Sequence, residues 1–158
     1  MKSKAVLTGL ILLLVCSSLS FKCDGGSTPP DSPLRPAAKA ADDIAGSINA
    51  MIKVKRTLAS QGSITPAEEK SLTNSLLKLN TADKLFVKQV KAVKNAPDVA
   101  ANKPNLCSLF ANVTSALSEL TTTGVLPVAN PSAKNQLTAL LTAFNASVPI
   151  ITNALQCP

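Results

Sequence analysis

The second half of the chain spaces its large apolar residues for packed helices. These residues recur at alternating steps of four and three, the period of one face of a helix that packs against another helix. Two such series are present: Leu106, Phe110, Val113, Leu117 and Leu120, and then Leu137, Leu141, Phe144, Val148, Ile151 and Leu155. A half-buried strand would alternate with a period of two, and no such pattern lasts over a strand's length. The spacing therefore predicts helices.

The first half predicts two more helices. The first, residues 37–61, ends at Gly62, because glycine readily takes the left-handed conformation that terminates helices, and its apolar stripe is Ile44, Ile48, Ile52 and Leu58. The second begins at Thr65, where Thr65-Pro66-Ala67-Glu68 has the pattern of a capping box with proline at the first helical position. Pro97 ends it near Asn95. Its stripe comprises Leu72, Leu76, Leu79, Ala82, Phe86, Val90 and Val93.

The remaining prolines and N-cap residues define the other two helices and the architecture. The third helix is expected to begin at Pro104, and the fourth to begin at Pro131, with Asn130 as its N-cap. Pro149 removes a backbone donor within the fourth helix and predicts a bend or a division into two helices. Four amphipathic helices joined by short loops most simply pack as an up-down-up-down four-helix bundle. We therefore expect one all-α domain at residues 37–158, a typical size for a single domain.

The N-terminus has the pattern of a secretory signal peptide. Lys2 and Lys4 precede an apolar run at residues 5–15 that is too short to span a bilayer, and small residues follow it. We expect cleavage to remove residues 1–20. Residues 21–36 are rich in proline and glycine and contain little that could be buried, so they predict a flexible tether.

A second processing route involves Cys16. The segment Leu13-Leu14-Val15-Cys16 resembles the box of bacterial lipoproteins, in which the cysteine is lipidated and becomes the new N-terminus. Cleavage after Ser20 would release the protein, whereas lipidation of Cys16 would anchor it. Both routes predict a secreted or cell-envelope protein, periplasmic or extracellular. We expect membrane contact only through this lipid anchor.

Three cysteines would remain after cleavage at Ser20, in an oxidising compartment. An antiparallel bundle places the start of the third helix and the end of the fourth at the same pole. We therefore expect a disulfide between Cys107 and Cys157, which would close a loop of about 50 residues. Pairing of Cys23 with either of them is the alternative. No two cysteines of the domain are close enough in sequence to predict a redox motif or a thiolate metal cluster.

The chain has a sparse chemical inventory. It contains no histidine, which excludes imidazole-based acid–base catalysis and imidazole metal ligation. The adjacent acids Asp42-Asp43 and Glu68-Glu69 diverge around a helix and do not face each other as a catalytic dyad would. We therefore expect no enzyme activity, no cofactor and no metal site.

Basic residues concentrate in the first half, at residues 53–56 and 84–94. Such clusters form either a binding surface for an anionic partner or a solvated face. A hairpin about Gly62 would bring residues 55–56 near residues 68–69 and Lys84 near Asp42 and Asp43, which favours the solvated face. No aromatic residue alternates with the lysines to stack on bases, so we expect no nucleic-acid binding.

These observations favour an exported, non-enzymatic structural or interaction module of the cell envelope, whose partner is an unknown protein or envelope component. The alternative is a carrier of an apolar small molecule or lipid between the helices, because the third and fourth helices carry few charges and residues 121–129 form an apolar loop. Self-association through the same two helices is a third hypothesis.

Overall fold

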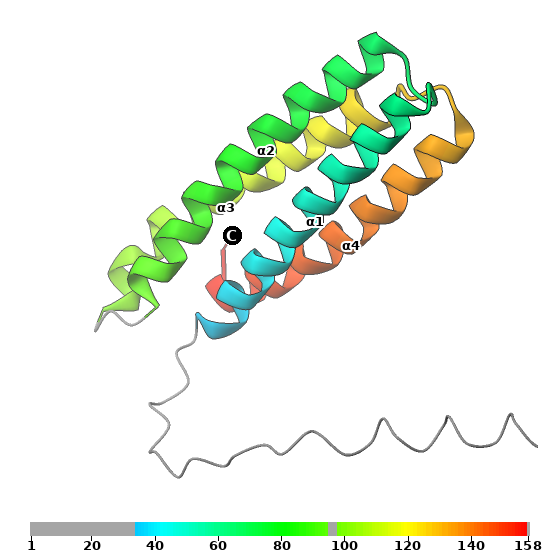
Figure 1. Cartoon of the computed structure of the whole chain (residues 1–158). Helices are drawn as coiled ribbons and strands as arrows, with labels where there is room; N and C mark the ends of the chain where they lie inside the picture. Colours follow the sequence, from blue (N-terminus) through cyan, green and yellow to red (C-terminus); the bar gives the residue numbers. More distant parts are fainter. Residues whose placement is uncertain (1–33, 95–97, 158) are drawn as a thin grey trace, which may run out of the picture. The chain divides into compact units, whose positions relative to one another are not determined.

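Four α-helices form the part of the chain that the structure, a computed structural model, describes: residues 34–94 and 98–157 (Figure 1). They are α1 (Arg35–Ser60), α2 (Pro66–Val93), α3 (Val99–Glu119) and α4 (Pro131–Leu155), and a π-helical segment, η1 (Leu120–Val125), follows α3. No strand occurs among these residues. The prediction of an all-α domain is therefore confirmed for them, while the predicted signal peptide, Cys16, Cys23 and most of the tether lie outside the described residues.

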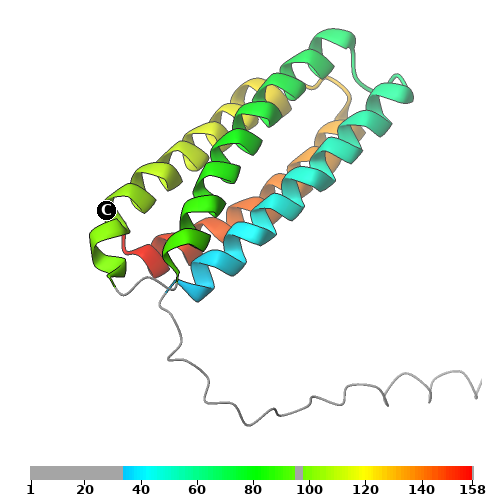
Figure 2. The same ribbon diagram turned by 60° about the vertical axis from the view of Figure 1, so that its left-hand side comes forward.

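The helices lie side by side, and each runs opposite to the one before it (Figures 1 and 2). α1 packs mainly against α4, α2 packs mainly against α3, and α1 also packs against α2, whereas α3 and α4 make few direct contacts. Two helix pairs are thus joined chiefly through α1 and α2. All four helices and η1 contribute to one hydrophobic core.

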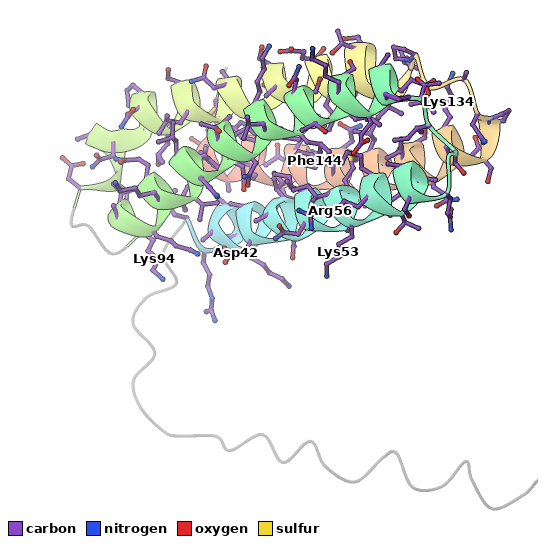
Figure 3. All side chains as sticks on the ribbon, turned by 45° about the horizontal axis from the view of Figure 1, so that its top comes forward. Asp42, Lys53, Arg56, Lys94, Lys134 and Phe144 are labelled. Atoms are coloured by element: carbon purple, nitrogen blue, oxygen red, sulfur yellow. A yellow bond between two sulfur atoms is a disulfide. The ribbon has the colours of Figure 1, made fainter. Side chains whose placement is uncertain are left out.

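Phenylalanine side chains fill the middle of this core. Phe86, Phe110 and Phe144 are all buried, as their positions in the apolar series predict. The rings of Phe86 and Phe110 approach to 5.4 Å between centroids, within the range of favourable aromatic pairs. Phe144 lies between the helices in Figure 3. These aromatic side chains belong to the packed interior.

α1 begins slightly before the predicted boundary at residue 37. Its first residue is Arg35, and Leu34, just before it, is buried with 2% of its surface exposed. Pro36 lies in the first turn, where a helix has no intrahelical use for the missing amide. At the other end Gly62 adopts a positive φ of 66°, as predicted, and the amide of Ser63 donates to the carbonyl of Leu58.

α3 differs from the prediction at both ends. It begins at Val99 rather than at Pro104, because the Asp98 side chain caps it by accepting from the Ala101 amide at 3.0 Å. Pro104 therefore lies inside the helix. At the other end the chain widens into η1, where Gly124 is buried. A Cβ at Gly124 would lie 2.9 Å from Leu120 Cδ1 and 3.4 Å from Leu72 Cδ2, so glycine allows η1 to approach α2 closely.

α4 starts as predicted. The Asn130 side chain accepts from the amides of Ser132 and Ala133, and the helix continues through Pro149 as one element, so a division there is wrong. Among the described helices, α4 alone has the length and mean hydropathy, 1.3, of a membrane-spanning helix. Its apolar series nevertheless packs into the core of the domain, with Leu137, Leu141, Phe144, Ile151 and Leu155 all buried.

The predicted capping box is present at the start of α2. Glu68 Oε2 accepts from the Thr65 amide at 2.6 Å, and the Glu68 amide donates to Thr65 Oγ1 at 3.2 Å. Glu68 Oε1 also accepts from the Ala129 amide at 2.7 Å, which ties the loop before α4 to the start of α2. These backbone donors stabilise the charged carboxylate and lower the pKa of Glu68.

We expect Glu68→Ala to lower the free energy of unfolding by about 1–2 kcal/mol, because it removes half of the capping box and the tie to Ala129. Glu69→Ala is the matched control, since it removes the same charge from the same turn and leaves the capping box intact, although it also removes the ion pair of the partly exposed Glu69 with Lys55 at 3.5 Å; it should change stability by less than about 1 kcal/mol. Urea denaturation at neutral pH measures both. Equal losses for the two variants would contradict this assignment.

Candidate functional site

The predicted disulfide joins the two helix pairs at one end of the domain. Cys107 of α3 and Cys157, just after α4, are bonded with Cα atoms 5.5 Å apart. Gln156 adopts a left-handed conformation, φ 51°, which ends α4 and turns the chain toward α3. Because α3 begins at Val99, it extends past Cys107 at this end and meets the longer α4. We call this end, with Leu34, Cys107 and Cys157, the disulfide pole.

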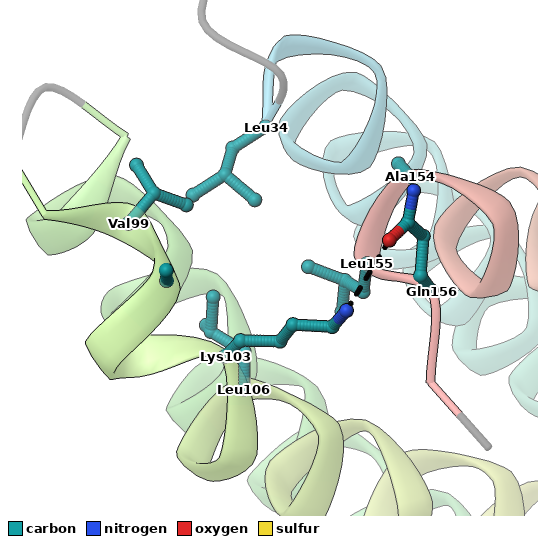
Figure 4. A pocket seen from close by; sticks show the side chains of 8 residues that line it. Leu34, Val99, Lys103, Leu106, Ala154, Leu155 and Gln156 are labelled. Carbon is teal, nitrogen blue, oxygen red and sulfur yellow. Dashed lines mark hydrogen bonds between the residues drawn. The ribbon is translucent and has the colours of Figure 1, made fainter.

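A small cavity of about 140 Å³ lies at the disulfide pole (Figure 4). Leu34, Val99, Leu106 and Leu155 give it apolar walls, and Lys103 Nζ donates to Gln156 Oε1 at 3.3 Å beside it. The volume is below the roughly 300 Å³ at which small-molecule sites begin. In this conformation the cavity therefore accommodates only a few non-hydrogen atoms.

Two charged residues occupy core positions in α1 and α2. The buried face of α1 follows alternating steps of four and three through Ala37, Ala41, Ile44, Ile48, Met51, Lys55 and Leu58. The buried face of α2 follows the same steps through Leu72, Leu76, Leu79, Asp83, Phe86, Val90 and Val93. Each series is interrupted once, by Lys55 and by Asp83.

Lys55 reaches the edge of the core and finds partners there. Its Nζ donates to Thr73 Oγ1 at 2.7 Å and lies 3.5 Å from Glu69 Oε1. The aliphatic stem is buried while the ammonium group lies beside a hollow of about 170 Å³ between α1 and α2. The predicted approach of residue 55 to residues 68–69 is therefore confirmed for Lys55 and Glu69.

Asp83 has no such partner. Only 1% of its surface is exposed, and Oδ1 accepts no hydrogen bond from any described group. Burial, and to a smaller extent the negative charge of Asp42, raise the pKa of Asp83 to about 7 against the opposing effect of Lys91. The carboxyl group therefore keeps its proton to a higher pH than an exposed aspartate does. It is the most strongly perturbed acid in the described part of the chain.

The ion pairs of α2 leave its outer surface basic. Lys78 pairs with Glu119 of α3, and Lys91 pairs with Asp42 of α1 at 3.0 Å. The partner of Asp42 is thus Lys91 rather than the predicted Lys84. Helical side chains lean toward the helix N-terminus, so Asp42 leans away from the hairpin loop while Lys91 leans back toward it, and the two meet. Lys84 remains exposed without an ion pair among the described residues.

An exposed strip follows the outside of α2 between these ion pairs. It consists of lysines and two leucines at helical spacing, Lys70, Leu77, Lys84, Leu85 and Lys88, and we call it the lysine–leucine face. Further cations project from α1, and Figure 3 shows Lys53 projecting from the same side of the molecule as Lys94, just after α2. By contrast, Lys103, Glu119 and Lys134 are the only charged residues from Val99 to Leu155. The net positive charge therefore lies on the α1–α2 half.

Two features of this surface and core could have been found in the sequence. Asp83 falls on the steps of four and three that begin at Leu72, so this spacing places Asp83 rather than Ala82 in the core. The lysine–leucine face follows from the same helical period, taken on the opposite side of α2. The pairing of individual charges along the hairpin indicates neither of them.

Comparison with protein-family models, with curated proteins and with solved structures finds no significant match for this chain. Within residues 34–94 and 98–157, no group of three or more acidic or cysteine side chains is arranged to hold a metal ion. Function must therefore be argued from the disulfide pole, the two charged core positions and the lysine–leucine face.

Proposed function

We propose that this chain is an exported, non-enzymatic interaction module of the cell envelope. The observation that carries this proposal is the Cys107–Cys157 disulfide, because structural disulfides persist in oxidising compartments and are rare in the reducing cytoplasm. The signal-peptide pattern of residues 1–20 supports the same location. In this proposal residues 21–36 form a tether that presents a four-helix bundle, either released or held by a lipid on Cys16.

The absence of enzyme activity is part of this proposal. The chain has no histidine, and its most perturbed acid, Asp83, is enclosed by the core rather than placed in a cleft that a substrate can enter. Binding needs only a persistent surface, which a disulfide-linked helical domain provides. The uneven charge of the two helix pairs offers such a surface on the α1–α2 half.

Intact mass measurement of the protein recovered from an expressing cell tests the proposal. We expect a mass that corresponds to loss of residues 1–20, or of residues 1–15 with acyl chains on Cys16, and in both cases a mass lower by two hydrogen atoms for the disulfide. Recovery of the unprocessed, fully reduced chain from the cytoplasm would refute export. A Lys2→Glu, Lys4→Glu variant, which removes the positive start of the signal peptide, should be processed less.

A carrier of an apolar small molecule or lipid is the second candidate. It is favoured by the few direct contacts between α3 and α4, and by the apolar walls of the cavity at the disulfide pole. Separation of these helices would enlarge the cavity toward the size of a ligand site. Native mass spectrometry of the same preparation tests it. Co-purified apolar molecules would support a carrier, and a measured mass equal to that of the protein alone would refute it.

A further inference from the structure

The outer surface of α2 combines exposed cations and apolar groups, and the acids beside it, Glu69 at its start and Glu119 of α3, pair with Lys55 and Lys78. Leu77 is 63% exposed and Leu85 is 53% exposed, and the other exposed large hydrophobic residues of the described chain are Leu126 at 55% and Ile150 at 47%. Lys70, Lys84 and Lys88 surround them and are also exposed. Between Glu69 and Asp98 the only acid is Asp83, which is buried. Two leucines on a soluble surface leave apolar area that an interaction would cover.

This surface is a ridge rather than a groove. Leu77 borders two hollows, one of about 170 Å³ toward α1 and one of about 380 Å³ toward η1 and α3, so it lies between them. From Lys70 to Lys88 the ridge extends about 27 Å along the helix axis. A long convex surface of this kind matches a deformable, extended partner better than a second helix, which would need a groove.

We propose that the lysine–leucine face binds the surface of an anionic phospholipid membrane. Leucines on such a helix enter the boundary between headgroups and acyl chains, while lysine ammonium groups stay at the level of the phosphates. This inference rests on the proposed function, since it names the envelope component that the exported module contacts. The sequence predicts membrane contact only through a lipid anchor, and this proposal adds a second contact through the folded domain.

Charge complementarity and the leucines together select this partner. The lysines would attract any polyanion, but a soluble polyanion gains nothing from Leu77 and Leu85. A membrane gains from both, because each lysine near an anionic surface strengthens binding by roughly fivefold and the leucines leave water. The two contributions therefore distinguish the membrane from a polysaccharide or an acidic protein.

Vesicle flotation tests the proposal. The protein is expressed with Cys16→Ser, so that no acyl chain on residue 16 can bind the vesicles. The probes are phosphatidylcholine vesicles with and without about one-third phosphatidylglycerol. We expect binding to the anionic vesicles only, weakened by salt. The variant Lys70→Gln, Lys84→Gln, Lys88→Gln should lower the partition coefficient by on the order of a hundredfold. The variant Leu77→Ser, Leu85→Ser should lower it by about tenfold.

A matched control keeps the net charge of the lysine variant. Lys39→Gln, Lys53→Gln, Lys134→Gln removes three cations outside the lysine–leucine face and should lower partition by less than about fivefold. The inference is overturned if this control loses as much binding as the lysine variant, if the leucine variant binds like the wild type, or if anionic vesicles are not bound. None of these results would contradict export and processing, because the intact mass tests those separately.

Discussion

Replacing Cys107 and Cys157 together by alanine is expected to lower the free energy of unfolding by about 4 kcal/mol. The disulfide spans 50 positions of sequence, and the entropy of closing a loop of that length in the unfolded chain gives this magnitude. For a domain of this size the loss corresponds to a fall in Tm of about 15 °C. Urea denaturation and thermal melts followed by circular dichroism measure both quantities.

The effect should be concentrated at the disulfide pole. α3 and α4 make few direct contacts, so the disulfide is the main connection between these two helices at that end. Hydrogen exchange in the double variant should therefore increase first in residues 99–107 and 150–157. Melting of the wild type with and without a reductant gives a second measurement, which remains informative if the double variant does not fold.

Cys23→Ala is the control for this prediction. It removes the third cysteine of the exported chain and leaves the observed disulfide intact, so stability should remain within about 0.5 kcal/mol of the wild type. A loss below about 1 kcal/mol in the double variant would contradict the loop-closure account. A large loss in Cys23→Ala would instead show that the tether takes part in the disulfide chemistry of the folded protein.

Helices and their pairing could be predicted because local patterns specify them redundantly. The start of α2 is marked at once by Thr65, Pro66 and Glu68, and the end of α1 by Gly62, and the structure has both where the sequence places them. The disulfide was predicted from antiparallel order, which places the start of α3 and the end of α4 at the same pole, with pairing of Cys23 as the alternative.

Other features depend on tertiary contacts that no local pattern encodes. The predicted start of α3 at Pro104 was wrong. Proline favours the first position of a helix, but the Asp98 side chain caps the helix earlier, so Pro104 lies inside it. In η1, Gly124 approaches Leu72 of α2, a residue far from it in sequence. The partner of Asp42 depended on the direction in which two side chains lean.

Of the candidate surfaces, one could be predicted from the sequence and the other could not. The lysine–leucine face is a property of one helix and was within reach of the sequence, whereas the cavity at the disulfide pole needs Leu34, α3 and α4 to meet. Buried polar positions require both kinds of information: the helical period identifies Asp83 as a core residue, but only packing shows that its Oδ1 has no hydrogen-bond partner. Polar residues at core positions commonly mark function or specificity rather than stability.

Asp83 should make the bundle less stable as the pH rises from about 5 to about 8. In the unfolded chain an aspartate releases its proton near 3.8, whereas burial holds the pKa of Asp83 at about 7 in the folded state. Between these values the folded state binds one more proton than the unfolded state, so unfolding becomes easier with increasing pH. The free energy of unfolding should fall by about 3 kcal/mol from about pH 5 to about pH 8 and stay level above that.

This pH range is otherwise almost free of titrating side chains. The chain has no histidine, and the lowered pKa of Glu68 places its titration below the range, where its stabilising contribution is lost as the pH falls. The charged groups that act on Asp83 are Asp42 of α1 and Lys91 of α2, which pair with each other. The charges of α3, Lys103 and Glu119, lie toward its two ends. A fall in stability over this range would therefore report on Asp83.

Asp83→Asn should abolish this dependence, because asparagine has nearly the shape of the protonated acid and does not ionise. We expect the variant to match the wild type within about 1 kcal/mol near pH 5 and to exceed its free energy of unfolding by about 2–3 kcal/mol near pH 8. Asp43→Asn, which removes an exposed acid of α1, should keep the wild-type dependence. Urea denaturation at several pH values measures all three proteins. A slope that persists in Asp83→Asn would assign the proton to another group, and a wild type without a slope would mean that water reaches Asp83.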